Sequence, residues 1–370
     1  MSNEDYYEIL AKKLDKSIPR LSPYGDKGNI SKTFVDYLKV LVDPEDVKYL
    51  LKLETVPVLT TLKRFAKKIK KSEEEAQKIL ERLIESDCVF KIGTKEPKYQ
   101  LNINPLIFNQ PSVRYFEFPE EKAKKLAKLS YKLFVEEEWY KTYSGSPETP
   151  LLRVIPVQQS IKTETLIMPY EDVVKIIDDA RYVSLAKCMC RARYEFLGIR
   201  KCKDKYPLET CIQLNYAARF YIERGLAREI SKKEAKELCK KFNKMGAVHT
   251  IENFGDDVHG LLCNCCPCCC LPLGGITRWD KPHSVAAANY IAVASNIENC
   301  EKCETCIDKC VFGAITMEAV GPIFNNEKCM GCGVCVVNCP SNVIELKPEK
   351  REKVHKDIME LVLNIGKGMD

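Results

Sequence analysis

The chain has 370 residues, a formal net charge of +6 and 20 cysteines, with 45% hydrophobic and 30% charged residues. This length allows two or three domains with cores of their own, and the mild charge does not by itself indicate nucleic-acid binding. No apolar stretch reaches the roughly 20 residues that span a bilayer, and the start lacks the basic and apolar segments of a signal peptide. We therefore expect a cytoplasmic protein, in which so many cysteines are metal ligands rather than disulfides.

Residues 1–118 carry the pattern of a winged helix-turn-helix domain. Ser72 and Glu75 have the form of a capping box, and the apolar residues that follow repeat at helical spacing. The isolated Cys88 beside apolar residues is expected to be a core thiol. The predicted elements are helices within 31–53, at 59–69 and at 73–85, then strands at 88–93 and 98–102.

The helix at 73–85, the second helix of the helix-turn-helix, does not favour DNA binding. Its outward positions would hold four acids against two bases, which is the wrong sign for contact with phosphates. Basic residues do lie just upstream, at 64–71. We interpret the domain as a structural or docking module and keep DNA recognition as the alternative.

Residues 119–150 read as a long helix to Lys141 followed by a linker, and residues 151–290 as a mixed α/β domain rich in cysteine. Strands are expected at 152–157, 182–186 and 247–251, with helices at 170–180 and 231–244. Cys239 has helical spacing with apolar neighbours and is expected in the core. The remaining cysteines of this domain are ligand candidates: Cys188, Cys190, Cys202, Cys211, Cys263, Cys265, Cys266, Cys268, Cys269 and Cys270.

Six of these candidates fall within residues 263–270. Neighbouring cysteines are too close to form unstrained disulfides, and dense soft thiolates indicate iron-sulfur clusters or another soft metal. Consecutive cysteines in an extended segment point to opposite sides, so Cys265/Cys266 and Cys268/Cys269 are expected to serve different clusters. We predict at least one further cluster from this domain, either 4Fe-4S or non-cubane.

Residues 291–348 contain two C-x2-C-x2-C-x3-C runs, the spacing of bacterial two-cluster ferredoxins. In that pattern the fourth cysteine of each run binds the other cluster. Zinc fits two tandem four-cysteine runs poorly. The region resembles the bacterial two-cluster ferredoxin fold, with Val311 where proline is usual. The predicted ligands are Cys300, Cys303, Cys306 and Cys339 for cluster 1, and Cys329, Cys332, Cys335 and Cys310 for cluster 2.

Charge differs between the last two regions. Residues 181–290 hold 19 Lys and Arg against 11 Asp and Glu, a balance of +8, whereas residues 297–345 hold three Lys against seven acids, a balance of −4. Basic groups lower thiolate pKa values and offset cluster charge, and an acidic outer face suits a basic redox partner. A helix is expected in the tail, residues 349–370.

The predicted fold class is therefore α+β multidomain, with a winged-helix-like N-terminal domain, a mixed α/β central domain and a ferredoxin-like C-terminal domain. The chain resembles a family of cytosolic 4Fe-4S binding proteins of anaerobes, through Cys188 to Arg191, Pro207 to Cys211 and Asn264 to Cys270. That resemblance implies redox work under anoxic conditions without naming a substrate.

Catalytic residues are not evident. Arg191, Arg193 and Arg278 are expected to offset cluster charge rather than to bind substrate, and His259 is expected to be solvated rather than a ligand. His249 is the other nearby imidazole. No GxGxxG or GxxxxGK[ST] motif supports nucleotide binding.

We predict an electron-transfer protein, or such a subunit of an anaerobic oxidoreductase, whose partners are other redox proteins. The alternatives are a redox- or iron-responsive winged-helix regulator and a reductase with an open iron site in the central domain.

Overall fold

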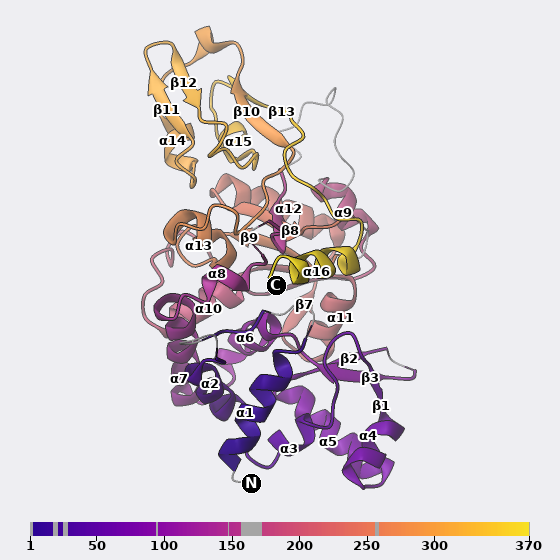
Figure 1. The fold of residues 1–370 in the computed structure, drawn as a ribbon. Coiled ribbons are helices and arrows are strands. Elements are labelled where there is room, and N and C mark those ends of the chain that lie inside the picture. The colour runs from indigo at the N-terminus through magenta and orange to yellow at the C-terminus, as the bar shows by residue number, and fades with distance from the viewer. Residues whose placement is uncertain are drawn as a thin grey trace. The chain divides into compact units, whose positions relative to one another are not determined.

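The computed structural model describes residues 3–17, 21–24, 29–93, 95–146, 148–156, 172–255 and 259–369 (Figure 1). The chain forms two compact units. The N-terminal unit comprises residues 1–146, 192–199 and 365–370, and the C-terminal unit comprises residues 147–191 and 200–364. The mixed α+β class is the predicted one.

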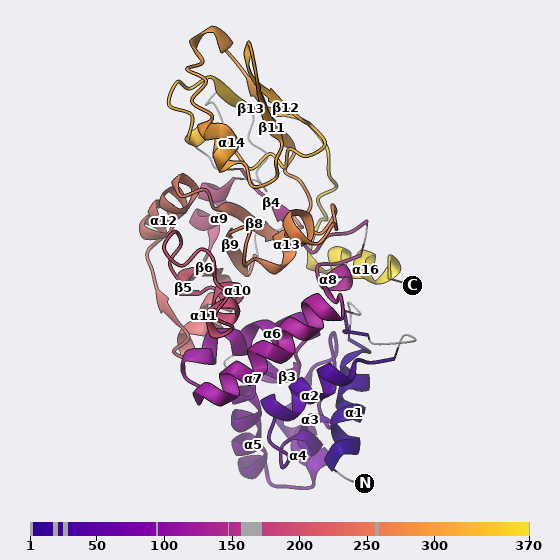
Figure 2. The ribbon, with the colours of Figure 1, turned by 90° about the vertical axis from the view of Figure 1, so that its left-hand side faces the viewer.

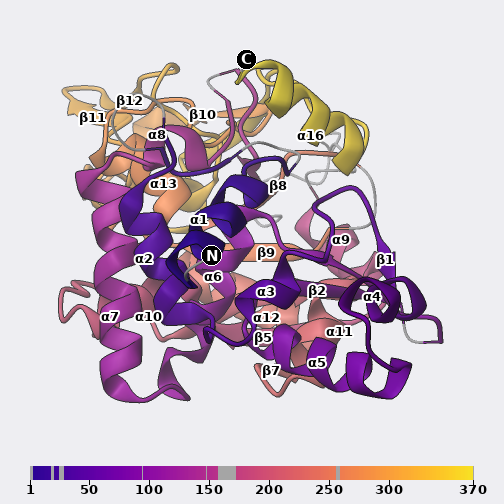
Figure 3. The ribbon, with the colours of Figure 1, turned by 60° about the horizontal axis from the view of Figure 1, so that its bottom comes forward.

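The N-terminal unit is mainly helical. Its sheet has three strands in the order β1-β3-β2, all antiparallel. Helix α2 runs alongside α7 (Figure 3). Its elements are α1 (Asn3–Leu14), α2 (Lys32–Leu41), α3 (Val47–Leu50), β1 (Thr60–Thr61), α4 (Leu62–Ile69), α5 (Glu73–Glu85), β2 (Val89–Ile92), β3 (Lys98–Leu101), α6 (Asn104–Val113), a 3-10 turn (Arg114–Phe116), α7 (Glu120–Tyr131), a π turn (Lys132–Glu136) and α8 (Tyr140–Tyr143).

Helix α5 begins where the sequence predicts. The Ser72 hydroxyl accepts from the Glu75 amide, and the Glu75 carboxylate accepts from the Ser72 amide, so the capping box is complete. Cys88 is buried as expected, and burial raises its pKa to about 12. The helices α4 and α5 and the strands β2 and β3 are predicted elements, but the helix predicted from residue 59 begins only at Leu62, because Thr60 and Thr61 form β1 and Thr61 caps the helix. The assignment to a winged-helix fold stays a prediction.

The single helix predicted over 119–141 is wrong in its second half. The α-helix α7 ends at Tyr131 and is followed by the π turn. The helical backbone then breaks at Glu138, whose φ is 53°. The break lets Trp139 and Phe134 pack together on Phe108, with ring centroids 4.4 to 6.4 Å apart. Burying these large aromatic rings outweighs the regular helix that local propensity favours.

The C-terminal unit contains a six-stranded antiparallel sheet in the order β4-β8-β9-β6-β5-β7, together with two small two-stranded sheets, β10-β13 and β11-β12. Its elements are β4 (Leu152–Val154), α9 (Val173–Asp179), β5 (Val183–Lys187), the start of α10 (Met189–Phe196), β6 (Glu209–Leu214), α11 (Asn215–Glu223), β7 (Ala227–Glu229), α12 (Lys232–Lys244), β8 (Val248–Glu252), β9 (Leu261–Cys265), α13 (Leu271–Arg278), β10 (Tyr290–Ala294), a 3-10 turn (Ile297–Asn299), α14 (Thr305–Lys309), β11 (Ile315–Glu318), β12 (Gly321–Phe324), α15 (Val334–Val337), β13 (Ile344–Pro348) and most of α16 (Ile358–Lys367).

The two faces of the large sheet differ in chemistry. One face packs its apolar residues, such as Leu262 and Ile251, against α9 and α12, and Cys239 lies in this core as predicted. Because strand residues alternate between faces, the neighbours of Leu262 in β9 point the other way. Cys263 and Cys265 alternate with Leu262 in this way, so the second face carries thiols. In Figure 2, α12 and α13 flank β8 and β9.

The predicted helix at 170–180 is α9, and the first two residues of that prediction lie outside the described part of the chain. The predicted strand at 152–157 is β4, whose final predicted position is likewise not described. In the tail, Leu361 and Ile365 of α16 are fully buried, as an amphipathic helix requires.

Candidate metal centre

An outer cavity in the region of the two cysteine runs is lined by Cys300, Cys303, Cys306 and Cys339. The loop that carries the first three bends through Lys302 and Glu304, whose φ values are 51° and 56°. This bend lets the Lys302 amide donate to the Cys300 sulfur at 3.4 Å. Cys303 is exposed, and a hydrogen bond with the Thr305 hydroxyl lowers its pKa. One corner of this cavity therefore faces solvent.

An inner cavity is lined by Cys310, Cys329, Cys332 and Cys335. Burial raises the pKa of Cys332 to about 12. The amides of Ala314 and Ala292 donate to the sulfurs of Cys310 and Cys329 at 3.4 and 3.5 Å. Amide donors stabilise thiolates, so both sulfurs are prepared to bind a positively charged centre.

Gly331 makes the inner loop possible. Its φ is +67°, and a Cβ added there would lie 2.4 Å from the Tyr290 carbonyl oxygen. Any larger residue would push the cysteine loop away from β10.

Each cavity takes three cysteines from one run and the last cysteine of the other run. The empty space, including the open mouths, is about 340 Å³ in the inner cavity and about 280 Å³ in the outer one. A water molecule occupies only about 30 Å³ in the liquid. Four thiols around a space of this size fit a 4Fe-4S group better than a single ion.

Comparison with protein families supports this chemistry. Residues 299–344 match one family described as a 4Fe-4S dicluster domain, and residues 328–365 match a second family with the same description. The chain belongs, through its C-terminal part, to the 4Fe-4S dicluster ferredoxins. Its ferredoxin domain contains both cavities.

A curated relative points the same way. The chain is 33% identical over 85 residues to "Pyruvate synthase subunit PorD" of Thermotoga maritima, a match that covers 21% of this chain and 84% of that protein. No solved structure matches the chain significantly. Within the described residues, no helix combines the length and apolarity needed to cross a bilayer.

Upstream of the ferredoxin domain, six cysteines lie close together on the thiol-bearing face of the large sheet. Cys211 of β6 lies beside Cys263 of β9, next to the register pair Ile212 and Leu262. Of the other members, Cys265 ends β9 and Cys190 lies in the first turn of α10, whereas Cys188 and Cys270 immediately precede α10 and α13. In order of contact, the members of this group, called the six-thiol ring below, are Cys188, Cys190, Cys270, Cys265, Cys263 and Cys211.

Thiol contacts within the ring bring about unequal protonation. Contacts with Cys263 and Cys270 lower the pKa of Cys265 well below its usual value, and the Cys270 sulfur lies 3.3 Å away. Contact with Cys211 raises the pKa of Cys263, and contact with Cys190 raises that of Cys270. The Thr250 hydroxyl, 3.4 Å from the Cys265 sulfur, also lowers the pKa of Cys265. The ring is a soft donor set that a positive centre would deprotonate.

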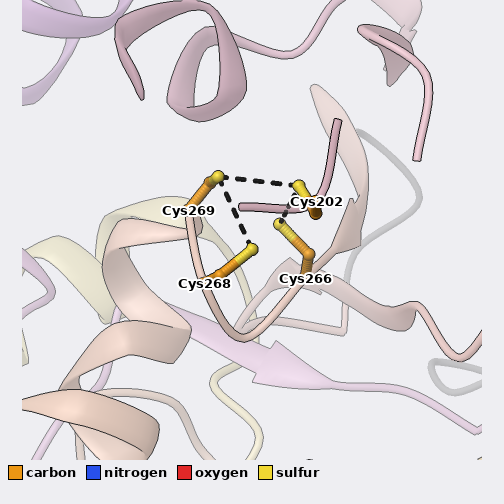
Figure 4. A group of neighbouring side chains, drawn as sticks. All are labelled: Cys202, Cys266, Cys268 and Cys269. Carbon is orange, nitrogen blue, oxygen red and sulfur yellow. Dashed lines mark hydrogen bonds between the residues drawn. The ribbon is translucent and has the colours of Figure 1, made fainter. Parts of the chain in front are cut away.

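The remaining four central candidates form a separate and tighter group, Cys202, Cys266, Cys268 and Cys269, called the tetrad below (Figure 4). Their four sulfurs all lie within 4.8 Å of one another. Cys265 and Cys266 thus point to different groups, as the sequence predicts, whereas Cys268 and Cys269 both point into the tetrad. The chain turns at Pro267 rather than staying extended. The alternation of side chains along a strand, on which the prediction for Cys268 and Cys269 depends, therefore does not apply there.

Arg191 is fully buried beside both groups. Burial acts to lower its pKa, but the thiolates of Cys188 and Cys266 raise it overall. Its guanidinium donates to the carbonyl oxygen of Asn264 at 2.9 Å and to the Thr210 hydroxyl, and lies 4.9 Å from the ring centroid of Tyr206. A permanent positive charge is therefore fixed where thiolate charge accumulates.

The other predicted cations differ in placement. Arg278 donates to the carbonyl oxygens of Cys268 and Cys270 at 2.8 and 2.5 Å, so it fixes the cysteine loop. Arg193 instead donates to the Phe108 carbonyl at 3.0 Å and the Ser112 hydroxyl at 3.1 Å within the N-terminal unit. It follows Arg191 by two positions on a helix, and this spacing turns the two side chains to different sides.

Neither histidine is a thiol neighbour. His249 is paired with Asn264 in the strand register and so points to the apolar face of the sheet, where burial lowers its pKa to about 4. The expectation that His259 is solvated is wrong. It is 2% exposed, stacks on Phe254 at 4.5 Å between ring centroids, and lies 3.4 Å from a Glu252 carboxylate oxygen.

Two polar residues near the thiols were not found from the sequence. Thr250 touches Cys265 because β8 pairs with β9, and Tyr206 covers Arg191 and donates to the Met245 carbonyl at 3.0 Å. Single threonines and tyrosines carry no motif, so only the strand register and the packing identify them.

Proposed function

We propose that the chain is a cytoplasmic iron-sulfur electron-transfer protein, the electron-relay subunit of an anaerobic oxidoreductase. Electrons would pass between a central iron-sulfur site and a partner through two 4Fe-4S clusters in the ferredoxin domain. One observation carries this proposal. A single continuous apolar core contains thiols of the outer cavity, the inner cavity and the six-thiol ring. Iron-sulfur clusters supply reversible one-electron chemistry at such sites.

The proposed ligand sets follow the cavities. Cys300, Cys303, Cys306 and Cys339 would hold cluster 1, and Cys310, Cys329, Cys332 and Cys335 would hold cluster 2. The six-thiol ring would hold the central cluster. A cubane needs four of its six thiolates, and a larger cluster can use all of them.

The exposure and the contacts of particular residues indicate the order of the proposed electron route. Exposed Cys303 marks the outer end, and the acidic side chains of Glu298, Glu301, Glu304 and Asp308 are exposed around it. Cys306 of the outer cavity and Cys329 and Cys335 of the inner cavity belong to the same buried core, so the two cavities adjoin. The Ala288 amide donates to the Met330 carbonyl at 3.1 Å, which ties the inner loop to the segment after α13.

A redox partner with a basic docking face would suit the acidic outer end. The relative from Thermotoga maritima is named as a subunit of pyruvate synthase. By analogy, we propose that this chain also works as a subunit or docked partner of an oxidoreductase. The substrate is that of the partner.

We propose the domain ranges 1–118, 119–150, 151–290, 291–348 and 349–370, with the first as a winged-helix-like docking module. The order α4, α5, β2, β3 supports the winged-helix assignment. A DNA-binding regulator is the alternative. The exposed Glu73, Glu74, Glu81 and Glu85 on α5 oppose it, because they would repel phosphates. An open-site reductase would need an iron in the ring without a protein thiolate.

The relay is tested by removing its outer end. Reduced methyl viologen, a cation that the acidic face attracts, serves as the electron donor under anoxic conditions. In the Cys303→Ala variant we expect the central cluster to be reduced roughly tenfold more slowly or worse, because electrons no longer enter within the acidic field. Stopped-flow absorbance and freeze-quench EPR measure the rate. Cys88→Ala, which removes an isolated buried thiol, is the control, and equal rates in both variants would rule out the relay.

A further inference from the structure

All four sulfurs of the tetrad lie within 4.8 Å of one another, which leaves no space among them for the iron and sulfide atoms of a cluster. We propose that Cys202, Cys266, Cys268 and Cys269 bind one tetrahedral divalent metal ion, Zn²⁺ or Fe²⁺, directly and without inorganic sulfide. This site is separate from the relay and does not depend on it.

The sulfur spacing carries the argument. Cys202 lies 3.8 Å from Cys266 and 3.7 Å from Cys269, and Cys268 lies 3.7 Å from Cys269. Metal-thiolate bonds of about 2.3 Å in a tetrahedron place neighbouring sulfurs about 3.8 Å apart. The thiols are therefore arranged around the volume of a single ion.

A cubane would need a wider arrangement, because its iron and sulfide atoms stand between the thiolates. The ferredoxin cavities of the same chain show that arrangement, with four cysteines lining an open space. Among the described residues, the tetrad is the only group of three or more potential ligands whose donor atoms all lie within 4.8 Å. The same molecule thus contains two different arrangements of four cysteines.

The tetrad also lies off the proposed electron route. The apolar core that joins both cavities to the six-thiol ring includes none of the four tetrad thiols among its described members. A redox cluster at the tetrad would need a path for electrons to the other clusters. A structural ion needs no such path.

The elements around the tetrad indicate what an ion would do there. Cys202 comes from an irregular loop, residues 200–206, and the other three thiols come from the turn after β9. Four thiolates leave no open position on a tetrahedral ion, which is typical of structural sites. The ion would fasten the loop to the cysteine turn and so position Tyr206 over Arg191.

The charge beside the tetrad is consistent with metal binding. Buried Arg191 offsets part of the negative charge that four thiolates leave on a divalent ion.

Counting metal and sulfide tests the proposal. The full-length protein, purified anaerobically, is compared with Cys202→Ser and with the control Cys239→Ala, which removes a core thiol of the same unit. We expect Cys202→Ser to lose one equivalent of zinc or iron while acid-labile sulfide is unchanged. Which metal is lost distinguishes Zn²⁺ from Fe²⁺. Loss of about four irons together with about four sulfides would establish a cubane instead, and loss of neither metal would also overturn the proposal.

A spectroscopic measurement on the wild type avoids the risk that Cys202→Ser fails to fold. X-ray absorption at the zinc edge should show four sulfur neighbours at about 2.3 Å, or Mössbauer spectra should contain one high-spin iron separate from all clusters. A protein that contains neither zinc nor such an iron refutes the site.

Discussion

The ferredoxin domain and the tetrad arrange the same residue type in opposite ways. In the ferredoxin domain, four cysteines line each of two cavities of about 340 and 280 Å³. In the tetrad, four cysteines bring their sulfurs within 4.8 Å of one another. The number of cysteines is equal, so the number alone does not determine what a site binds. The backbone that carries the thiols makes the difference.

Each backbone has a local cause. Positive φ at Lys302, Glu304, Gly331 and Gly333 curls the ferredoxin loops, and several amides donate to cysteine sulfurs. In the tetrad, Pro267 interrupts the strand, and the turn brings Cys266, Cys268 and Cys269 to one point. A curled loop leaves room for a cluster core, and a tight turn does not.

The largest predicted effect tests whether a cavity, rather than a run, is the unit that binds a cluster. Cys310 and Cys335 belong to different runs but line one cavity. We therefore expect the double variant Cys310→Ala/Cys335→Ala to lose about four irons and four sulfides, the content of a single cluster. Iron and sulfide analysis of anaerobically purified protein measures this.

The matched control is Cys303→Ala/Cys335→Ala, which also removes one cysteine from each run but affects both cavities. It should lose about eight irons. If the first double variant loses as much iron as the second, the two runs bind their clusters independently and the exchange of fourth cysteines is wrong.

The ferredoxin domain could be predicted from the sequence because its ligands are identified by the spacing of cysteines that are close together along the chain. Two four-cysteine runs with fixed spacing indicate the ligand sets, and the structure gathers the same sets around the two cavities. The capping box at Ser72 and the core position of Cys239 are local signals of the same kind.

The division of the central cysteines depends on pairing over long distances and could not be predicted. Cys202 joins residues more than 60 positions away, and Cys211 meets Cys263 only because β6 pairs with β9. The turn at Pro267 placed Cys268 and Cys269 in one group against the alternation rule, and tertiary aromatic packing broke the helix predicted to Lys141. Non-local contacts decided each of these outcomes.

A smaller effect should come from Arg191, whose charge lies beside both central groups. In Arg191→Met the loss of a buried positive charge disfavours the more negative, reduced form of the ring cluster. We expect its reduction potential to fall by on the order of 100 mV, from an interaction over several ångströms at an effective dielectric constant near 20. Redox titration followed by EPR measures the shift.

Arg193→Met is the control for Arg191, because Arg193 makes its hydrogen bonds within the N-terminal unit. If the tetrad holds zinc, the Arg191 variant should shift the potential of one central species only. Two shifted central potentials would show that the tetrad is redox active and would erase the distinction between an ion site and a cluster site.

The smallest effect concerns the other, apolar face of the sheet. Burial lowers the pKa of His249 from 6.5 to about 4, so its folded form binds a proton less readily than the unfolded chain. Between these two pKa values the unfolded state binds more protons, and stability therefore falls as the pH falls below 6.5. From pH 7.5 to pH 6.0 the loss from this residue should be about 0.8 kcal/mol.

His249→Leu removes this contribution, so its unfolding free energy should depend less on pH than that of the wild type by that amount. Anaerobic denaturant titrations at the two pH values measure the difference, and both values stay above the range in which acid would attack the clusters. His283→Leu, which replaces an exposed histidine, serves as the comparison. If His249→Leu keeps the pH dependence of the wild type, then His249 is solvated in the folded protein. Water would in that case reach the apolar face of the sheet.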